Sequence, residues 1–208
     1  MRSGVVGGIY GRGVGDYAQT LVDVDATDED APRLKQRVLS WLINDQIVAA
    51  ELSDCVLGAE EGGYAPGENY SYAIVGRGSV PVTAPRLWTN GLSIDATRSV
   101  YWASDLDSVT CPRCGHREPL ELAGDGDGRF VTAFRPAMLT WVDGGSGEVA
   151  CASCGEDVGL NDWEWSHPWA FGTLGVKMWN WDPIGEEFIT DLSELLDGHR
   201  LVYSCYKL

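Results

Sequence analysis

Two short cysteine motifs constrain this chain more than any other feature of its sequence. Cys111-Pro-Arg-Cys114-Gly and Cys151-Ala-Ser-Cys154-Gly share the form Cys-x-x-Cys-Gly. Two intervening residues let a tight turn direct both sulfurs at one ion, and the glycine allows the positive φ that closes the turn. Four thiolates complete the tetrahedral coordination of Zn²⁺, which leaves no position for an activated water. The sequence therefore predicts one structural zinc ion bound by Cys111, Cys114, Cys151 and Cys154.

Other chemistries fit these residues less well. A disulfide framework is typical of short secreted chains, whereas this chain has 208 residues and we expect no secretory signal, since residues 1–10 have no sustained apolar core. A redox Cys-x-x-Cys normally stands alone at a helix start. His116 could replace a ligand, but four better-spaced thiols exist. Asp125 and Asp127 lack the glutamate of a calcium loop. Cys55 and Cys205, each in an apolar stretch, are predicted to be buried free thiols.

Two strand-helix-strand units flank the cysteine motifs. The first has a strand at Ala18–Val24, an amphipathic helix at Pro32–Asp45 and a more buried strand within Ile47–Leu57. The second has a strand at Leu174–Trp181, a helix at Pro183–Leu196 and a strand at Arg200–Tyr206. Two such units could interleave into a ferredoxin-like sheet with both helices on one face. We therefore predict an α+β fold with one sheet and an inserted or appended zinc ribbon.

The segments between these elements are predicted from their composition. Gly58–Gly78 is rich in glycine and is expected to be a loop, and Arg86–Trp102 is expected to form a hairpin that turns at Asn90-Gly91. Phe130–Phe134 and Met138–Val142 are predicted to be strands of an elaborated ribbon. The expected division is an N-terminal α/β region at 1–104, a zinc-ribbon module at 105–160 and a C-terminal unit at 161–208 that packs back on the first.

Net charge limits the partners that the chain can bind. The sequence has 31 acidic and 15 basic residues, and its formal net charge is −16. An acidic surface repels phosphates, so direct binding to nucleic acid is disfavoured and a basic protein partner is favoured. No apolar run approaches the roughly 20 residues of a membrane helix, so we expect a cytoplasmic protein that does not bind membranes. Acidity that serves only solubility is the alternative.

Aromatic residues are concentrated near the C-terminal unit. Five of the nine tryptophans lie within 19 residues: Trp163, Trp165, Trp169, Trp179 and Trp181. Alternation predicts that Trp163 and Trp165 share one face of a strand, and likewise Trp179 and Trp181. These rings are expected to join two domains in a core or, if exposed, to bind a partner. Three loop tyrosines have the same two interpretations, since they could cover the sheet edge or contact a partner: Tyr64, Tyr70 and Tyr72.

Several segments together resemble a known group of proteins. They are Asp54–Gly58, Gly63–Gly67, the two cysteine motifs, Trp163-x-Trp165 and Trp179-Asn-Trp181. With these segments the chain resembles uncharacterised bacterial proteins that have a central zinc ribbon. The resemblance spans most of the chain and implies a structural class, with no activity to transfer.

Three functions are compatible with the sequence, and we expect the first. It is a non-catalytic, zinc-containing module that binds a basic protein, as an immunity, inhibitor or adaptor protein would. The second is a zinc-ribbon factor that acts with nucleic acid or the transcription machinery through Arg113, His116, Arg117 and Arg129. The third is an enzyme with an unfamiliar active site, although the chain lacks hydrolase, metalloprotease and phosphate-loop motifs.

Overall fold

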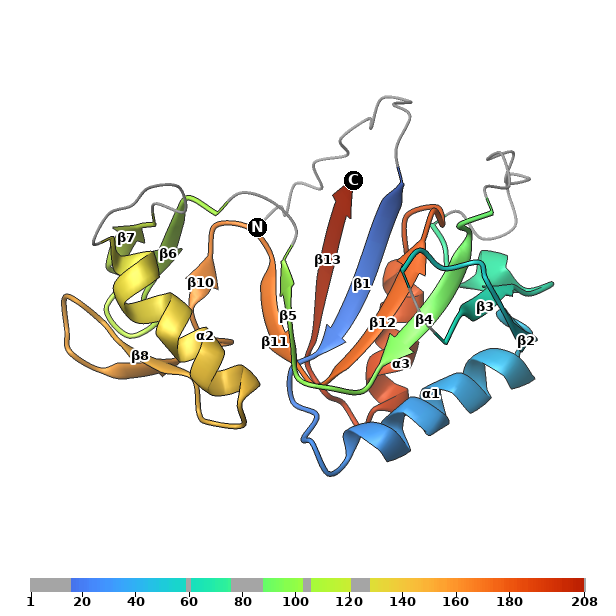
Figure 1. Ribbon diagram of the computed structural model, residues 1–208, viewed down its shortest axis with the longest axis horizontal. Helices are drawn as coiled ribbons and strands as arrows, with labels where there is room; N and C mark the ends of the chain where they lie inside the picture. Colours follow the sequence, from blue (N-terminus) through green and yellow to red (C-terminus); the bar gives the residue numbers. More distant parts are fainter. Residues whose placement is uncertain (1–15, 59–60, 76–87, 103–105, 121–127, 208) are drawn as a thin grey trace.

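The computed structural model describes residues 16–58, 61–75, 88–102, 106–120 and 128–207. They form a large lobe, in which two helices pack on a sheet, and a small lobe that contains the cysteine motifs (Figure 1). The large sheet has the order β13-β1-β12-β4-β3-β2, and every neighbouring pair is antiparallel. Its strands are β1 (Tyr17–Asp23), β2 (Val48–Ser53), β3 (Gly63–Pro66), β4 (Gly91–Asp95), β12 (Leu174–Trp179) and β13 (Leu201–Lys207).

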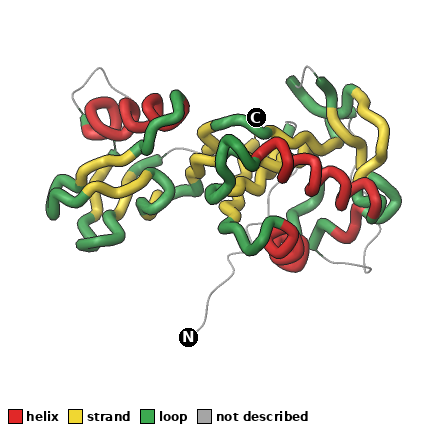
Figure 2. Tube along the Cα trace, turned by 90° about the horizontal axis from the view of Figure 1, so that it is seen from below, coloured by secondary structure: helices red, strands yellow, loops and turns green. Residues whose placement is uncertain are grey.

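Both helices of the large lobe pack on one face of this sheet. Helix α1 (Ala31–Asn44) connects β1 to β2, and α3 (Glu186–Leu195) connects β12 to β13. Apolar residues recur at three- and four-residue steps, which turns Leu34, Val38 and Leu42 of α1 toward the sheet. Burial of each such side chain contributes about 1.5–3 kcal/mol. Seen from below, α1 and α3 lie together on one side of the strands (Figure 2).

The elements of the two strand-helix-strand units are confirmed, but their sheet is larger than predicted. β1 lies between β12 and β13, so the units interleave, whereas β3 and β4 lie between β12 and β2. The ferredoxin-like arrangement is therefore not confirmed. β2 forms an edge of the sheet, and only Val48 of its residues is buried, so the prediction of a more buried strand is wrong. No helix of the described residues is long and apolar enough to cross a membrane.

Two predictions about the intervening segments are also wrong. The loop expected at Gly58–Gly78 contains β3 and a 3₁₀ turn, η1 (Tyr70–Tyr72). The hairpin expected to turn at Asn90-Gly91 would pair the residues before Asn90 with β4, but β4 instead pairs with β3 and β12, and β5 (Ser99–Trp102) pairs with β11 (Trp169–Gly172). Partners distant in the sequence thus override the local turn signal. The expected first arm of the hairpin, up to residue 87, lies outside the described residues.

The small lobe consists of short strands covered by one helix. Its strands are β6 (Ser108–Thr110), β7 (Arg117–Pro119), β8 (Glu148–Ala150), β9 (Asp157–Gly159) and β10 (Glu164–Trp165). A π-helical turn, η2 (Phe130–Phe134), runs into helix α2 (Arg135–Val142), so the two strands predicted here are wrong. Phe134, Ala137 and Met138 are buried at a helical spacing. The prediction failed because a five-residue apolar run fits a strand as well as a helix.

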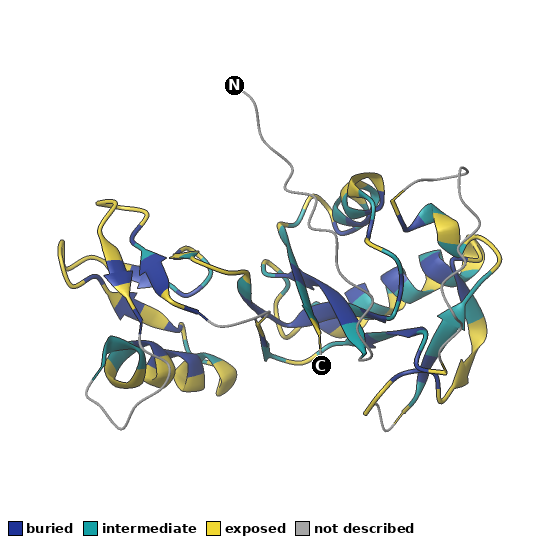
Figure 3. Cartoon of the chain, turned by 90° about the horizontal axis from the view of Figure 1, so that it is seen from above, coloured by how far each residue is buried: buried dark blue, intermediate teal, exposed yellow. Residues whose placement is uncertain are grey.

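The β5–β11 pair joins the two lobes. Val100 and Phe171 are paired in register and pack with the core of the small lobe. Tyr101 and Ala170, paired beside them, point the other way and pack with Val22 of the large sheet. Because successive residues of a strand face opposite sides, one ribbon contributes to both cores. Figure 3 shows buried residues on the strands of both lobes. The three-part division of the chain stays a prediction.

Trp179 and Trp181 do not share one face, contrary to the prediction. Trp179 packs with Ala18, and Trp181 belongs to the core beneath the helices. Asn180 between them has a φ of 54°, and its side chain donates hydrogen bonds to Asp16 and Thr89. This left-handed residue ends the strand alternation. The tryptophans therefore occupy separate cores.

Candidate metal centre

Each cysteine motif forms the turn of a short hairpin. The first lies between β6 and β7, where the Cys111 N–H donates to the His116 carbonyl and the Gly115 N–H donates to the Cys111 carbonyl, both at 2.9 Å. The second, between β8 and β9, repeats these two bonds with Cys151, Glu156 and Gly155, again at 2.9 Å. The two motifs therefore fold into equivalent turns.

The glycine of each motif is required by its conformation. Gly115 has a φ of 71° and Gly155 a φ of 76°, in the left-handed region that side chains with a Cβ disfavour. A Cβ at either position would meet no atom within 4 Å, so space is not the constraint. The sequence argument for Cys-x-x-Cys-Gly thus has a direct structural basis.

All four cysteine sulfurs converge on one point between the hairpins. Sγ of Cys111 lies 4.0 Å from Sγ of Cys154, Sγ of Cys114 lies 3.7 Å from Sγ of Cys151, and all four lie within 4.8 Å of one another. A tetrahedral metal with roughly 2.3 Å metal–sulfur bonds gives sulfur–sulfur distances of about 3.8 Å. The cluster can therefore hold one metal ion. Cys111 and Cys151 are buried, and Cys114 and Cys154 are exposed.

The turn backbone favours a thiolate at one of these positions. The backbone N–H groups of Cys154 and Ser153 lower the pKa of the Cys151 thiol to about 6, and the Ser153 nitrogen lies 3.4 Å from its sulfur. For Cys154, the backbone N–H of Glu156 lowers the pKa, but local desolvation and hydrogen bonds with the neighbouring sulfurs raise it to about 12. Closely spaced thiols cannot all lose their protons at once, because the thiolate charges repel one another. A bound cation would offset this repulsion and allow all four sulfurs to be thiolates.

The core of the small lobe supports both hairpins. Val109 and Val149 lie just before the first cysteine of each motif and are buried with Phe134 of η2. The ring of Trp163 meets Phe134 edge-on, with centroids 5.1 Å apart, and its indole N–H donates to the Val158 carbonyl. The four cysteines and this core therefore lie in the same pair of hairpins.

The predicted partner-binding tryptophans differ in exposure. Trp163 is buried, whereas Trp165 and Trp169 are half-buried and stack with centroids 5.5 Å apart. Trp102, which sequence reasoning missed, is 58% exposed and lies 6.4 Å from Trp169, and Phe130 meets Trp169 edge-on at 6.2 Å. We call Trp102, Trp169, Trp165 and Phe130 the aromatic strip. No local signal identifies Trp102, because its neighbour Trp169 is distant in the sequence.

The predicted tyrosines belong to the other lobe. Tyr64, Tyr70 and Tyr72 are half-buried and pack against the core of the large sheet. The Tyr70 ring meets Trp181 edge-on at 6.0 Å, and the Tyr72 hydroxyl donates to the Asp191 carboxylate. The structure therefore does not bring these tyrosines together with the predicted tryptophans in one cluster.

Two of the four residues considered for nucleic acid binding are engaged within the protein. Arg129 lies 2.7 Å from the buried Glu118 carboxylate and also donates to the Ala150 carbonyl. Arg117 donates to the Ser108 hydroxyl at 2.9 and 3.0 Å. Arg113 and His116 are exposed. Arg117 is exposed as well despite its hydrogen bonds, and so is Arg135 of α2, so the small lobe keeps several arginines at its surface.

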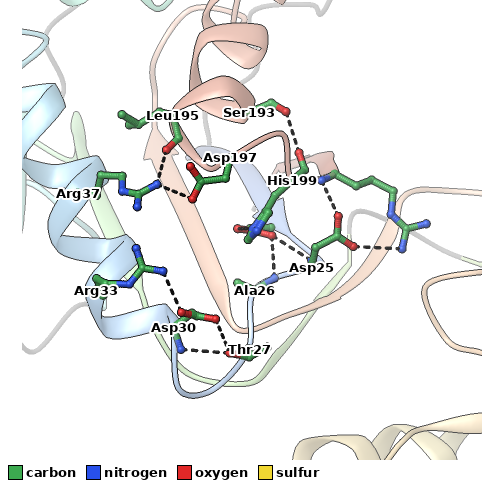
Figure 4. Close-up of polar contacts among 12 residues, drawn as sticks. Asp25, Ala26, Thr27, Asp30, Arg33, Arg37, Ser193, Leu195, Asp197 and His199 are labelled. Carbon is green, nitrogen blue, oxygen red and sulfur yellow. Dashed lines mark hydrogen bonds and ion pairs between the residues drawn. The ribbon is translucent and has the colours of Figure 1, made fainter.

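A polar cluster in the large lobe is relevant to the third function considered above, an enzyme with an unfamiliar active site. Where α1 meets the end of α3, Arg33 pairs with Asp30 and Arg37 pairs with Asp197 (Figure 4). The buried Asp23 accepts two backbone hydrogen bonds from Asp25 and Ala26, and its Oδ2 lies 2.8 Å from Nδ1 of His199. Each of these carboxylates is held by neighbours in the fold, so the cluster connects α1 and β1 to the segment between α3 and β13.

Comparison with known proteins adds no relative from which a function could be transferred. No protein-family model matches the chain, and no curated protein or solved structure shows significant similarity to it. The geometry of this chain must therefore carry the functional argument.

Proposed function

We propose that this chain is a non-catalytic zinc protein that binds a basic protein partner, as an immunity, inhibitor or adaptor protein would. The observation that carries the proposal is the aromatic strip, which extends from the β5–β11 ribbon onto the lobe that contains the four cysteines. Tryptophan is enriched at binding hot spots because its large ring buries much area with little loss of conformational entropy. The exposed Trp102 is the natural anchor of such an interface.

Zinc fits the donor set best among common metals. Thiolate ligands select soft or borderline cations, and four thiolates in paired Cys-x-x-Cys turns are typical of structural zinc sites. A tetrahedron filled by protein ligands has no position for substrate or water. The metal would therefore hold the hairpins together, and activity would come from the surfaces of the lobe.

Charge favours a basic partner. The formal net charge of −16 raises the encounter rate with cationic proteins and repels nucleic acid. The ion pair between Arg129 and the buried Glu118 also removes one of the candidate cations from a phosphate-binding surface. A protein partner is therefore favoured over the transcription-factor alternative.

Capture from extract of the native host tests the proposal. The tagged wild-type chain is compared with Trp102→Ala, and with Leu52→Ala as a control, since Leu52 is 56% exposed on the other lobe. We expect a basic protein to be retained at low salt, weakened at high salt and by Trp102→Ala, and unaffected by Leu52→Ala. Absence of a partner, or retention that responds to neither salt nor Trp102→Ala, would overturn the proposal.

A further inference from the structure

A hollow in the large lobe lies outside the surface used above. Its volume is about 400 Å³, within the roughly 300–1,000 Å³ of ligand sites. It is lined in part by Glu68, Tyr70, Trp88 and Asn90, which come from the segment after β3 and the segment before β4. Tyr70 is one of the tyrosines considered for partner binding, and it forms part of the wall of this hollow.

Aromatic rings form part of this lining. Trp88 is 67% exposed, which is unusual for so large an apolar side chain. Tyr70 makes an edge-on contact with the buried Trp181, 6.0 Å away between centroids. The faces of such rings carry negative potential and attract ammonium and guanidinium groups. The hollow thus combines one anchored ring with one accessible ring.

The lining contains two oxygen acceptors that suit a cation, the Glu68 carboxylate and the Asn90 side-chain oxygen. Glu68 is exposed and is the charged residue of the described lining, which contains no lysine or arginine. Oδ1 of Asn90 is buried and has no hydrogen-bond partner among the described residues. An unpaired buried acceptor is uncommon in proteins and needs an explanation, and a donor bound in the hollow would supply one. The complementary ligand is therefore a cation that carries several N–H donors.

We propose that this hollow binds the cationic side chain of an arginine or lysine on a protein partner. Trp88 and Tyr70 would lie against the charged group, and Glu68 would be its counter-ion. That the cation belongs to a protein rests on the proposed function, whereas the preference for an organic cation rests on the lining alone. The hollow is in the large lobe, so it would add a second contact to the one made by the aromatic strip.

A pair of small probes isolates the charge. N-acetyl-arginine amide and N-acetyl-citrulline amide have nearly the same shape, but only the first is cationic. Each is titrated into the full chain while the Trp88 indole N–H resonance, assigned with Trp88→Phe, is followed by NMR. We expect saturable shifts with the arginine compound and at least about fivefold weaker binding of the citrulline compound, as loss of a cation–π contact and an ion pair predicts.

Two carboxylate variants provide the matched control. Glu68→Gln is expected to weaken the arginine compound several-fold, whereas Glu51→Gln, which removes the same charge from exposed β2, leaves its affinity unchanged. Both positions are exposed, so thermal unfolding should show an intact fold. Equal binding of both probes, or wild-type affinity in Glu68→Gln, would overturn the site. Tighter binding of spermidine than of an arginine-containing peptide would overturn the assignment to a protein.

Failure of this inference is distinguishable from failure of the proposed function. If a captured basic partner binds Trp88→Ala like the wild type but loses affinity for Trp102→Ala, the proposed function stands and the hollow has no part in it. If the arginine compound binds through Trp88 and Glu68 but no protein is captured, the cation site stands and the protein source is refuted.

Discussion

Arg98 is held by Asp28 of the large lobe, with its Nε 2.8 Å from the Asp28 Oδ2. The same guanidinium donates from Nη1 to the carbonyl oxygens of Trp141 and Gly145, at 2.8 and 3.1 Å, where α2 of the small lobe ends. It also lies over the Trp141 ring, 5.0 Å from its centroid. A cation is favoured at a helix C-terminus, where carbonyl groups lack helical partners. One side chain thus connects the lobes beside the β5–β11 ribbon.

Replacement of Arg98 should weaken this connection. Arg98→Ala is expected to lower the free energy of unfolding by about 1–3 kcal/mol, because charged hydrogen bonds to three residues are lost. The matched control is Arg33→Ala, which removes an ion pair on α1 whose arginine side chain is 56% exposed and should cost about 0.5 kcal/mol or less. Urea denaturation measures both. Equal effects of the two substitutions would show that Arg98 does not join the lobes.

Removal of a metal ligand should unfold the small lobe. Cys151→Ser is expected to bind substoichiometric metal and to lose several kcal/mol of stability, since the binding energy of a structural site is folding energy. Elemental analysis should find about one zinc per wild-type chain. Cys205→Ser serves as the control, because Cys205 is half-buried in β13 outside the cluster and should leave the metal content unchanged. Wild-type stability of Cys151→Ser would refute a structural role for the metal.

The elements that could be predicted from the sequence are those with a long, regular pattern. The helices at Ala31–Asn44 and Glu186–Leu195 bury apolar residues at helical spacing over several turns, so periodicity alone identifies them. The cysteine positions could be predicted for a different reason, because ligand spacing within each turn is local. Both signals are independent of how the rest of the chain packs.

The errors arise where the outcome depends on distant partners. β5 pairs with β11, which is 67 residues further along the chain at Trp102 and Trp169, and no local pattern specifies that register. Phe130–Val142 is helical, and burial of Phe134 and Met138 in the core under the cysteine hairpins stabilises this conformation. Asn180 adopts a left-handed conformation that its hydrogen bonds to Thr89 stabilise. The exposed Trp102 of the aromatic strip was missed for the same reason.

The helical conformation of the segment between the cysteine motifs predicts which of its side chains stabilise the fold. Phe134→Ala should cost about 3–5 kcal/mol, since the ring is fully buried and contacts both Trp163 and Trp165. Leu139→Ala, five residues later, should change stability by less than about 0.5 kcal/mol because Leu139 is 59% exposed. Thermal unfolding of the metal-loaded protein gives both values. Similar losses would contradict the orientation of η2 and α2.

The last prediction concerns acid sensitivity at the start of β1. The Thr89 hydroxyl and then the Asn180 amide donate hydrogen bonds to Asp16, at 2.7 and 2.8 Å, and lower the pKa of its carboxyl. Because the pKa is lower in the folded state, the stability that Asp16 adds is complete above the ordinary aspartate pKa of about 3.9. It is lost as the pH falls through the lowered pKa of the folded state.

Asp16→Asn should therefore be less stable than the wild type at pH 6, and the difference should shrink as the pH falls below about 4. Urea midpoints measured from pH 6 to pH 2.5 follow this change. Since both donors to Asp16 are neutral side chains, the difference at pH 6 should persist at high salt, unlike that of an exposed ion pair. A constant difference across the pH range would mean that the Asp16 charge does not contribute, and collapse in salt would indicate a distant cation as its partner.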